Sequence, residues 1–198
     1  MNPICVALDT PDPARAAALT ASLKGTVGYV KIGMELFYAA GPKAYEQIAS
    51  LGVPVFLDLK LHDIPNTVAQ GLTSLLTLSP APAIVNVHAS GGRAMMEAAA
   101  KAVSGRAKLI AVTILTSLAD GDIHEAGYDR ARSTADQAEA LARLARDCGL
   151  DGVVCSALDI TRIRAACGPE FLTVVPGIRP AGGPVQDQKR VATPEQAI

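Results

Sequence analysis

A short run of charged residues follows an apolar stretch in the segment FLDLKLHDIPNTV, residues 56–68. Asp58 and Lys60 are two positions apart, so in a strand their side chains leave on the same face, and Asp63 follows just past the strand end. This spacing predicts that Lys60 lies between two carboxylates. In a partly desolvated site, each charge favours the ionised form of its neighbours. A lysine held as a cation is a poor Schiff-base nucleophile but a good proton donor where negative charge develops.

The same segment has a simpler interpretation, a surface ion-pair cluster at a strand end, which is common and contributes little. Lys31, in the segment GYVKIG, favours a functional role, because a lysine at an apolar strand end has to be paired or solvated in a cavity. Asp9 and Asp58, at neighbouring strand ends, are available as its partners. We therefore expect a catalytic charged array of Asp9, Lys31, Asp58, Lys60 and Asp63.

The elements that would position these residues alternate along the chain, with β-branched runs separated by alanine-rich helical stretches. Strands are predicted at residues 4–8, 29–32, 53–59, 83–88, 109–115, 152–155 and 172–175. Helices are predicted at residues 13–23, 34–51, 66–77, 93–103, 134–148 and 158–167. A further helix is expected to start in TPEQAI, with Thr193 as its N-cap and Pro194 at its first position.

Continuously apolar strands that alternate with helices predict a parallel sheet covered by helices, either an open doubly wound sheet or a closed (β/α)8 barrel. An open sheet gathers ligand groups where its strand order reverses, whereas a barrel draws them from the C-terminal ends of many strands. Polar residues lie at the end of every predicted strand here: Asp9, Lys31, Asp58, Lys60, His88, Thr116, Ser156 and Arg179. We therefore favour a TIM barrel with about seven β/α units, forming a single domain over residues 1–198.

The composition limits the classes of function. With 49% hydrophobic and 19% charged residues, the 198-residue chain can bury a sizeable core. A net charge of -1 without a Lys/Arg-rich block argues against nucleic-acid binding. The four cysteines lack a C-x-x-C pair, so neither zinc nor disulfides are predicted. The longest apolar stretch is too short to span a bilayer, and the N-terminus has no signal-peptide pattern, so we expect a cytoplasmic protein that acts on a small metabolite.

Several motifs of the chain carry a resemblance to a known family. The segment DLKLHDIPNT resembles the D-x-K-x-x-D motif of the orotidine 5'-phosphate decarboxylase family. The likeness continues in the family's order through VALD, VKIG, VNVHASGG, VTILTS and PGIRP followed by DQKRVATPEQA. The resemblance implies a (β/α)8 barrel that converts orotidine 5'-phosphate into UMP and CO2 in de novo pyrimidine synthesis, without a metal or an organic cofactor.

The resemblance also implies roles for the charged residues, position by position. Lys60 matches the proton donor to C6 of the pyrimidine, and Asp58 matches the carboxylate that faces the carboxylate of the substrate. Lys31 completes the array and, like Asp9, contacts the ribose.

Other matched residues extend the implied site. Asp63 and Thr67 match residues that reach the ribose of the neighbouring subunit's substrate, which implies a homodimer with shared active sites. Thr116 matches a position at the pyrimidine ring. Arg179 and Gln188 fall in the loop that closes over the phosphate, where Gln188 bridges the phosphate and the base.

The chain departs from the family at its C-terminus. Family members continue past the position of Ile198 into an eighth strand, which ends in a Gly-Arg pair that binds the phosphate. Seven strands would leave exposed ladder edges, and the missing arginine would remove a charge-assisted contact. We expect the 198-residue chain to be C-terminally incomplete and, alone, poorly stable or impaired.

Two other functions stay open. Mg²⁺-dependent sugar-phosphate decarboxylases and aldolases of the same suprafamily share D-x-K-x-x-D, but they have glutamate where this chain has Lys31. A non-catalytic UMP-binding protein would keep the charged array without turnover.

The three histidines show no metal-ligand spacing. The segment ASGG at residues 89–92 favours a tight turn over a phosphate cradle.

Overall fold

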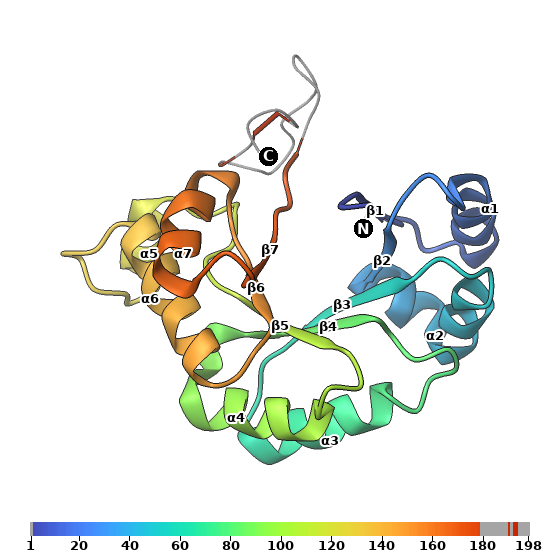
Figure 1. The fold of residues 1–198 in the computed structure, drawn as a ribbon, viewed down its shortest axis with the longest axis horizontal. Helices are drawn as coiled ribbons and strands as arrows, with labels where there is room; N and C mark the ends of the chain where they lie inside the picture. The colour runs from blue at the N-terminus through green and yellow to red at the C-terminus, as the bar shows by residue number, and fades with distance from the viewer. Residues whose placement is uncertain (1, 179–189, 191, 194–198) are drawn as a thin grey trace. The chain divides into compact units, whose positions relative to one another are not determined.

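The structure is a computed structural model that describes residues 2–178, 190, 192 and 193. Its strands are β1 (Cys5–Ala7), β2 (Tyr29–Gly33), β3 (Val55–Leu61), β4 (Ile84–His88), β5 (Lys108–Val112), β6 (Gly152–Val154) and β7 (Leu172–Val174) (Figure 1). Its helices are α1 (Pro13–Leu23), α2 (Met34–Ala49), α3 (Pro65–Leu75), α4 (Gly92–Val103), α5 (Asp120–Glu125), α6 (Thr134–Asp147) and α7 (Ile160–Cys167). Two short 3-10 turns, η1 (Ala89–Gly91) and η2 (Ala157–Asp159), precede α4 and α7.

The order of the strands decides between the two predicted architectures. The sheet runs β1-β2-β3-β4-β5-β6-β7, in the order of the chain. The pairs β1–β2, β2–β3, β3–β4, β5–β6 and β6–β7 are all parallel. A doubly wound sheet would reverse its order at a switch point, so the observed order supports the barrel-type topology.

The predicted elements are present, with boundaries that differ by at most three residues for the strands. Helix α5 was not predicted, because GDIHEAG is polar and has a glycine at each end, which is typical of a loop. The helix is nevertheless capped, since Asp122 Oδ2 accepts a hydrogen bond from the Ala119 N–H at 2.7 Å. The predicted turn at residues 89–92 is η1 and the start of α4. The helix predicted from Thr193 falls on residues 194–198, outside the described residues.

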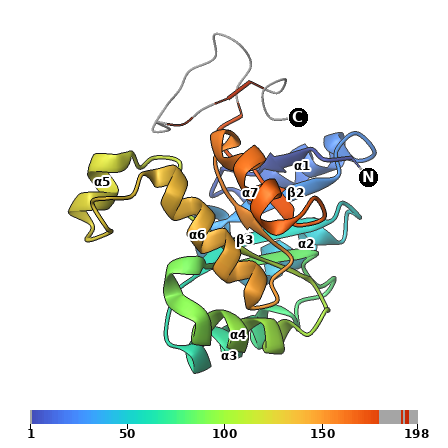
Figure 2. The ribbon, with the colours of Figure 1, turned by 60° about the vertical axis from the view of Figure 1, so that its left-hand side comes forward.

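Two compact units make up the chain: Met1–Val87 with Ala98–Leu109, and His88–Glu97 with Ile110–Ile198. In the first unit, α1 and α2 pack against each other (Figures 1 and 2). In β2, Val30 and Ile32 are buried while Tyr29, Lys31 and Gly33 are half-buried. Because alternate side chains share a face of a strand, Lys31 lies on the less buried side of β2.

In the second unit, α6 and α7 lie side by side (Figures 1 and 2). Helix α6 begins with a capping box, in which Ser133 Oγ accepts from the Asp136 N–H at 3.1 Å and Asp136 Oδ2 accepts from the Ser133 N–H at 3.0 Å. Arg162 of α7 pairs with Asp136 and Glu139 of α6. Within the described part of the chain, no helix is both long and apolar enough to cross a membrane.

Candidate active site

A buried carboxylate, Asp58 of β3, is the centre of a charged cluster in the first unit. Its side chain is 9% exposed. Asp58 Oδ1 accepts hydrogen bonds from Lys60 Nζ and from Asn86 Nδ2, each at 2.7 Å. Asp58 Oδ2 lies 3.4 Å from Lys31 Nζ. Both oxygens of one buried carboxylate are therefore engaged by cationic or amide groups, which is what a charge in a low-dielectric interior requires.

Lys31 joins the cluster from the neighbouring strand. Strand β2 pairs in parallel with β3, and the register places Gly33 opposite Asp58. Lys31 Nζ reaches both Asp58 and Asp9, the latter at 3.5 Å to Oδ1. Asp9 follows β1 and its side chain is 72% exposed, so the cluster runs from the buried Asp58 out to solvent. The structure thus brings Asp9, Lys31, Asp58 and Lys60 together.

An irregularity in the pairing of β3 with β4 places Lys60. Leu57 is opposite Val85 and Leu61 is opposite Val87, so the three residues between them on β3 face a single residue, Asn86, on β4. Lys60 adopts a φ of 52°, in the left-handed region. For a residue with a Cβ atom this conformation costs about 1–2 kcal/mol. β-Bulges and strained backbone of this kind concentrate next to active sites.

Two ionisable groups in this cluster have shifted pKa values. Burial by itself would raise the pKa of Asp58, but the hydrogen bond from Lys60 and the charges of Lys60 and Lys31, with a smaller effect of Asn86, hold it below its ordinary value. Burial raises the pKa of the neighbouring Cys5 thiol to about 11, against the opposing effect of Lys31. At neutral pH, Asp58 is therefore a carboxylate and Cys5 is a neutral thiol.

The position of Asp63 differs from the prediction. Lys60 was expected between two carboxylates, but Asp63 Oδ1 accepts from the Ile64 N–H at 2.6 Å, and no ion pair with Lys60 is found among the described residues. Instead, Asp58 lies between two lysines, Lys31 and Lys60. The chain turns into α3 at this point, with Pro65 at its first position, and this turn directs Asp63 away from Lys60. Asp63 is exposed on the surface of the first unit.

Thr67, the other predicted site residue of this segment, is also exposed, and so is the neighbouring His62. Thr116 belongs to the second unit and is buried, with 6% of its surface exposed. Arg179 and Gln188 lie outside the described residues.

Two residues that connect other segments through hydrogen bonds were not predicted from the sequence. Asn86 is 1% exposed and bridges Asp58 and Lys60. Its signal was a polar side chain inside the apolar run IVNV, residues 84–87. In the second unit, Arg190 donates to Asp159 Oδ2 at 2.9 Å and to the Ile114 carbonyl at 3.0 Å, and its N–H donates to the Thr116 carbonyl at 3.1 Å. Arg190 belongs to the segment DQKRVATPEQA, but the motif did not indicate this anchoring role.

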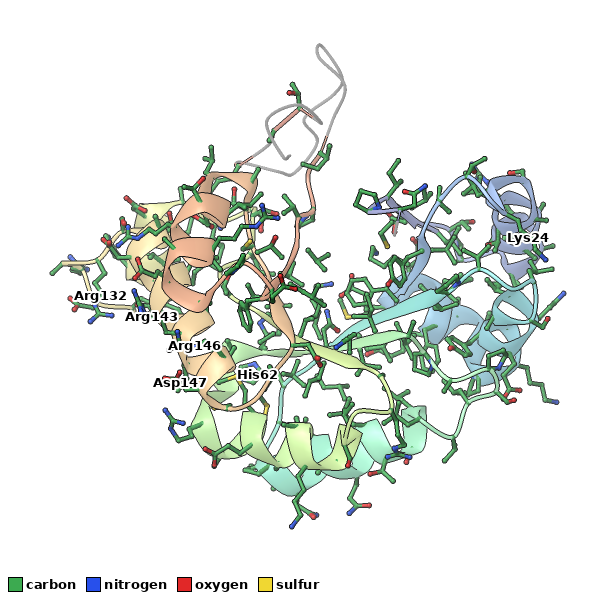
Figure 3. All side chains as sticks on the ribbon, viewed as in Figure 1. Lys24, His62, Arg132, Arg143, Arg146 and Asp147 are labelled. Carbon is green, nitrogen blue, oxygen red and sulfur yellow. The ribbon has the colours of Figure 1, made fainter. Side chains whose placement is uncertain are left out.

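The charges on α6 are different in kind. Arg143, Arg146 and Asp147 project from this helix (Figure 3). The pair Arg146–Asp147 is 40% and 45% exposed, so it contributes little to stability. Across the described residues, no three His, Cys, Asp or Glu side chains are grouped as metal ligands.

Comparison with known proteins places this geometry in context. Residues 2–198 match the model of the orotidine 5'-phosphate decarboxylase / HUMPS family. An orotidine 5'-phosphate decarboxylase of Paramagnetospirillum magneticum is 47% identical over 205 residues, covering 100% of this chain and 86% of that protein. One of Erythrobacter litoralis is 50% identical over 196 residues, covering 99% of this chain and 85% of that protein.

A solved structure confirms the fold class. The crystal structure of orotidine 5'-phosphate decarboxylase from Lactobacillus acidophilus matches with a TM-score of 0.84 at 36% identity, over 100% of this chain and 85% of that chain. The chain therefore has the α/β fold of the (β/α)8 TIM barrel, of which seven parallel strands are described here.

Proposed function

Because the chain belongs to the orotidine 5'-phosphate decarboxylase / HUMPS family, whose model it matches over residues 2–198, we propose that it converts orotidine 5'-phosphate into UMP and CO2, with Lys60 as the proton donor to C6. The observation that carries this proposal is the array Lys31–Asp58–Lys60, in which a buried carboxylate holds two ammonium groups in fixed positions. The product UMP places the reaction in pyrimidine biosynthesis.

The reaction needs electrostatic stabilisation and a proton. When the bond from C6 to the carboxylate breaks, CO2 departs and the electron pair stays on C6, where no good resonance sink exists. Lys60 stabilises this developing charge and then transfers a proton to C6, which leaves a neutral amine that regains its proton from water. Asp58 faces the carboxylate of the substrate and holds the Lys60 ammonium at 2.7 Å. Only interactions that strengthen in the transition state accelerate this step.

The remaining substrate contacts complete the proposal. Lys31 and Asp9 contact the ribose. Their ion pair, 3.5 Å between Lys31 Nζ and Asp9 Oδ1, supports a contact with the same part of the substrate. Thr116 serves the pyrimidine ring. Arg179 and Gln188 serve the phosphate, and both lie outside the described residues.

A homodimer with shared sites is part of the proposal. Asp63 and Thr67 would reach the ribose in the partner's site, which agrees with their exposure. Ile64 between them is 68% exposed, although a large apolar side chain gains from burial. A partner subunit packed on this segment would cover Ile64.

Lys31 also argues against the Mg²⁺-dependent alternative. Its ammonium lies 3.4 Å from Asp58, so this carboxylate already has a cation beside it and a divalent ion would meet repulsion. Turnover that persists in the presence of a chelator is expected for the decarboxylase.

The four cysteines are free thiols, which fits a reducing compartment such as the cytoplasm.

The test is the substitution Lys60→Ala, followed by the loss of orotidine 5'-phosphate. Removing the proton donor is expected to lower kcat by about 10²–10⁴-fold. The matched control is Lys24→Ala, which removes an exposed lysine of the same unit (Figure 3) and is expected to leave kcat unchanged. Turnover that is independent of Lys60 would refute the mechanism, and UMP binding without turnover in the unaltered chain would favour a non-catalytic protein.

A further inference from the structure

Asn86 is a buried polar residue in an otherwise apolar stretch of β4. Ile84, Val85 and Val87 around it are buried, and Asn86 itself is 1% exposed. Burying a polar side chain at such a place costs free energy of folding unless its hydrogen bonds are made. Its side chain makes one bond as acceptor and one as donor, and both go to residues of the proposed active site.

The first bond holds the backbone of Lys60. Asn86 Oδ1 accepts a hydrogen bond from the Lys60 N–H at 2.8 Å. At this point three residues of β3 face one residue of β4, so the regular ladder is interrupted. The side chain of Asn86 takes the place of a main-chain acceptor, and it does so for the residue whose φ of 52° is unfavourable. This bond therefore supports the backbone conformation from which the Lys60 side chain starts.

The second bond holds the carboxylate that positions the ammonium of Lys60. Asn86 Nδ2 donates to Asp58 Oδ1 at 2.7 Å, the same oxygen that accepts from Lys60 Nζ. A carboxylate only accepts and a backbone N–H only donates, so the amide of Asn86 has one consistent orientation. Because the amide is neutral, it adds a donor to Asp58 without changing the charge of the array.

We propose that Asn86 is a positioning residue for the proton transfer, and that it fixes Lys60 at both ends, through the backbone N–H and through Asp58. The inference rests on the proposed function, since it concerns the delivery of the Lys60 proton. Both bonds are short, and both lie within the first unit. Asparagine is suited to this place because its side-chain amide combines donors and an acceptor in one planar group.

The first variant is Asn86→Ala, which removes both bonds. Misplacement of a reacting group by about 1 Å can cost about 10²-fold in rate, so we expect kcat to fall by about 10²-fold. The affinity for UMP, measured by calorimetry, is expected to change much less, because Asn86 does not contact the ligand in the proposed role. Exchange of the Lys60 amide hydrogen, followed by NMR, is expected to accelerate.

The second variant is Asn86→Asp, which has nearly the same shape. Two carboxylates about as close as Asn86 Nδ2 and Asp58 Oδ1, which are 2.7 Å apart, repel each other, so the pKa of one of them is strongly raised and it keeps a proton at lower pH. When the introduced carboxyl group is the protonated partner, it donates to Asp58 and still accepts from the Lys60 N–H, as asparagine does. As the pH rises, the proton is lost, the introduced carboxylate and Asp58 repel each other, and the pairing with Lys31 and Lys60 is disturbed. We therefore expect kcat of this variant to fall with rising pH, through an ionisation that the unaltered enzyme lacks.

The control for lost packing is Val85→Ala, on the same strand and 1% exposed. Val85→Ala and Asn86→Ala are both expected to lower the thermal unfolding temperature, but Val85→Ala is expected to leave kcat per folded molecule and the pH profile unchanged. The inference is overturned if both Asn86 variants keep the kcat and pH profile of the unaltered enzyme while Lys60→Ala abolishes turnover. If Lys60→Ala keeps its turnover, the proposed function fails instead. The pH profile of Asn86→Asp remains a test even where Asn86→Ala does not fold.

Discussion

Asp58 is the carboxylate at the centre of the charged cluster. It is the only carboxylate among Asp9, Asp58 and Asp63 whose side chain is buried, and it pairs with Lys31 and Lys60 at once. A buried charge is tolerated only when its partners are in place. The proposed chemistry and the stability of the first unit therefore depend on the same side chain.

The pH dependence of stability tests this role of Asp58. Its pKa is lowered in the folded protein, so its contribution is fully present above the unfolded value of about 3.9 and is lost as the pH falls through the folded value. At pH 7, Asp58→Asn is expected to destabilise by about 1–3 kcal/mol, the cost of leaving charged partners unsatisfied. The measurement is urea unfolding of both proteins from pH 7 down to about pH 3. The difference between them should shrink towards acid, and a constant difference would contradict the assignment.

At the residue scale, the sequence predicted that Asp9, Lys31, Asp58 and Lys60 gather, but it also placed Asp63 beside Lys60, where the structure does not. The spacing of Asp58 and Lys60 and the embedded Lys31 were sufficient to predict the array. The bulge was not predictable, because the register of β3 against β4 depends on the partner strand. For the same reason the bridging role of Asn86 was missed. The separation of Asp63 from Lys60 was missed because it depends on how the chain turns into α3.

At the scale of elements, the alternating pattern predicted the strands and most helices because buried parallel strands read as apolar runs. Strand β3 shows the limit of this rule. It extends to Leu61, through Asp58 and Lys60, where the pattern had placed its end at residue 59. Polar residues in a strand end do not stop the ladder when each finds a partner.

The pairing of β6 with β7 gives a prediction at this scale. A Cβ atom at Gly152 would clash with the Leu172 carbonyl oxygen, and the register places these two residues opposite each other. Gly152→Ala is expected to lower the free energy of unfolding by about 1–3 kcal/mol through overpacking. The measurement is chemical denaturation at neutral pH.

A matched control exists in the same unit. At Gly121, in α5, an added Cβ meets no atom within 4 Å. Gly121→Ala is therefore expected to leave stability unchanged or slightly raised, since alanine has the higher helix propensity. Equal effects of the two substitutions would show that backbone entropy, rather than the close approach, governs position 152.

At the scale of the whole molecule, the proposed dimer makes a prediction about mixed subunits. If Asp63 acts in the partner's site, Asp63→Ala and Lys60→Ala would each impair both sites of their own homodimers. In a hybrid of the two variants, one site carries both substitutions and the other carries neither. Co-expression or subunit exchange is therefore expected to restore turnover above that of either variant alone.

The control is a hybrid of Lys60→Ala with Asp58→Asn, two residues that act in the same site. Every site of this hybrid carries one substitution, so no turnover should return. Equal recovery in both hybrids, or a monomer by light scattering, would contradict shared sites.

The sequence predicted a single domain over residues 1–198, and this stays a prediction. The structure describes two compact units.

The left-handed backbone of Lys60 has a consequence for the evolution of the fold. The conformation at position 60 favours glycine or asparagine, whereas the chemistry proposed for it requires lysine. Selection for stability and selection for turnover thus pull this position in opposite directions. A lineage that keeps the bulge but no longer needs the reaction is expected to drift to glycine there, so the identity of this one residue would mark which descendants of the fold are still enzymes.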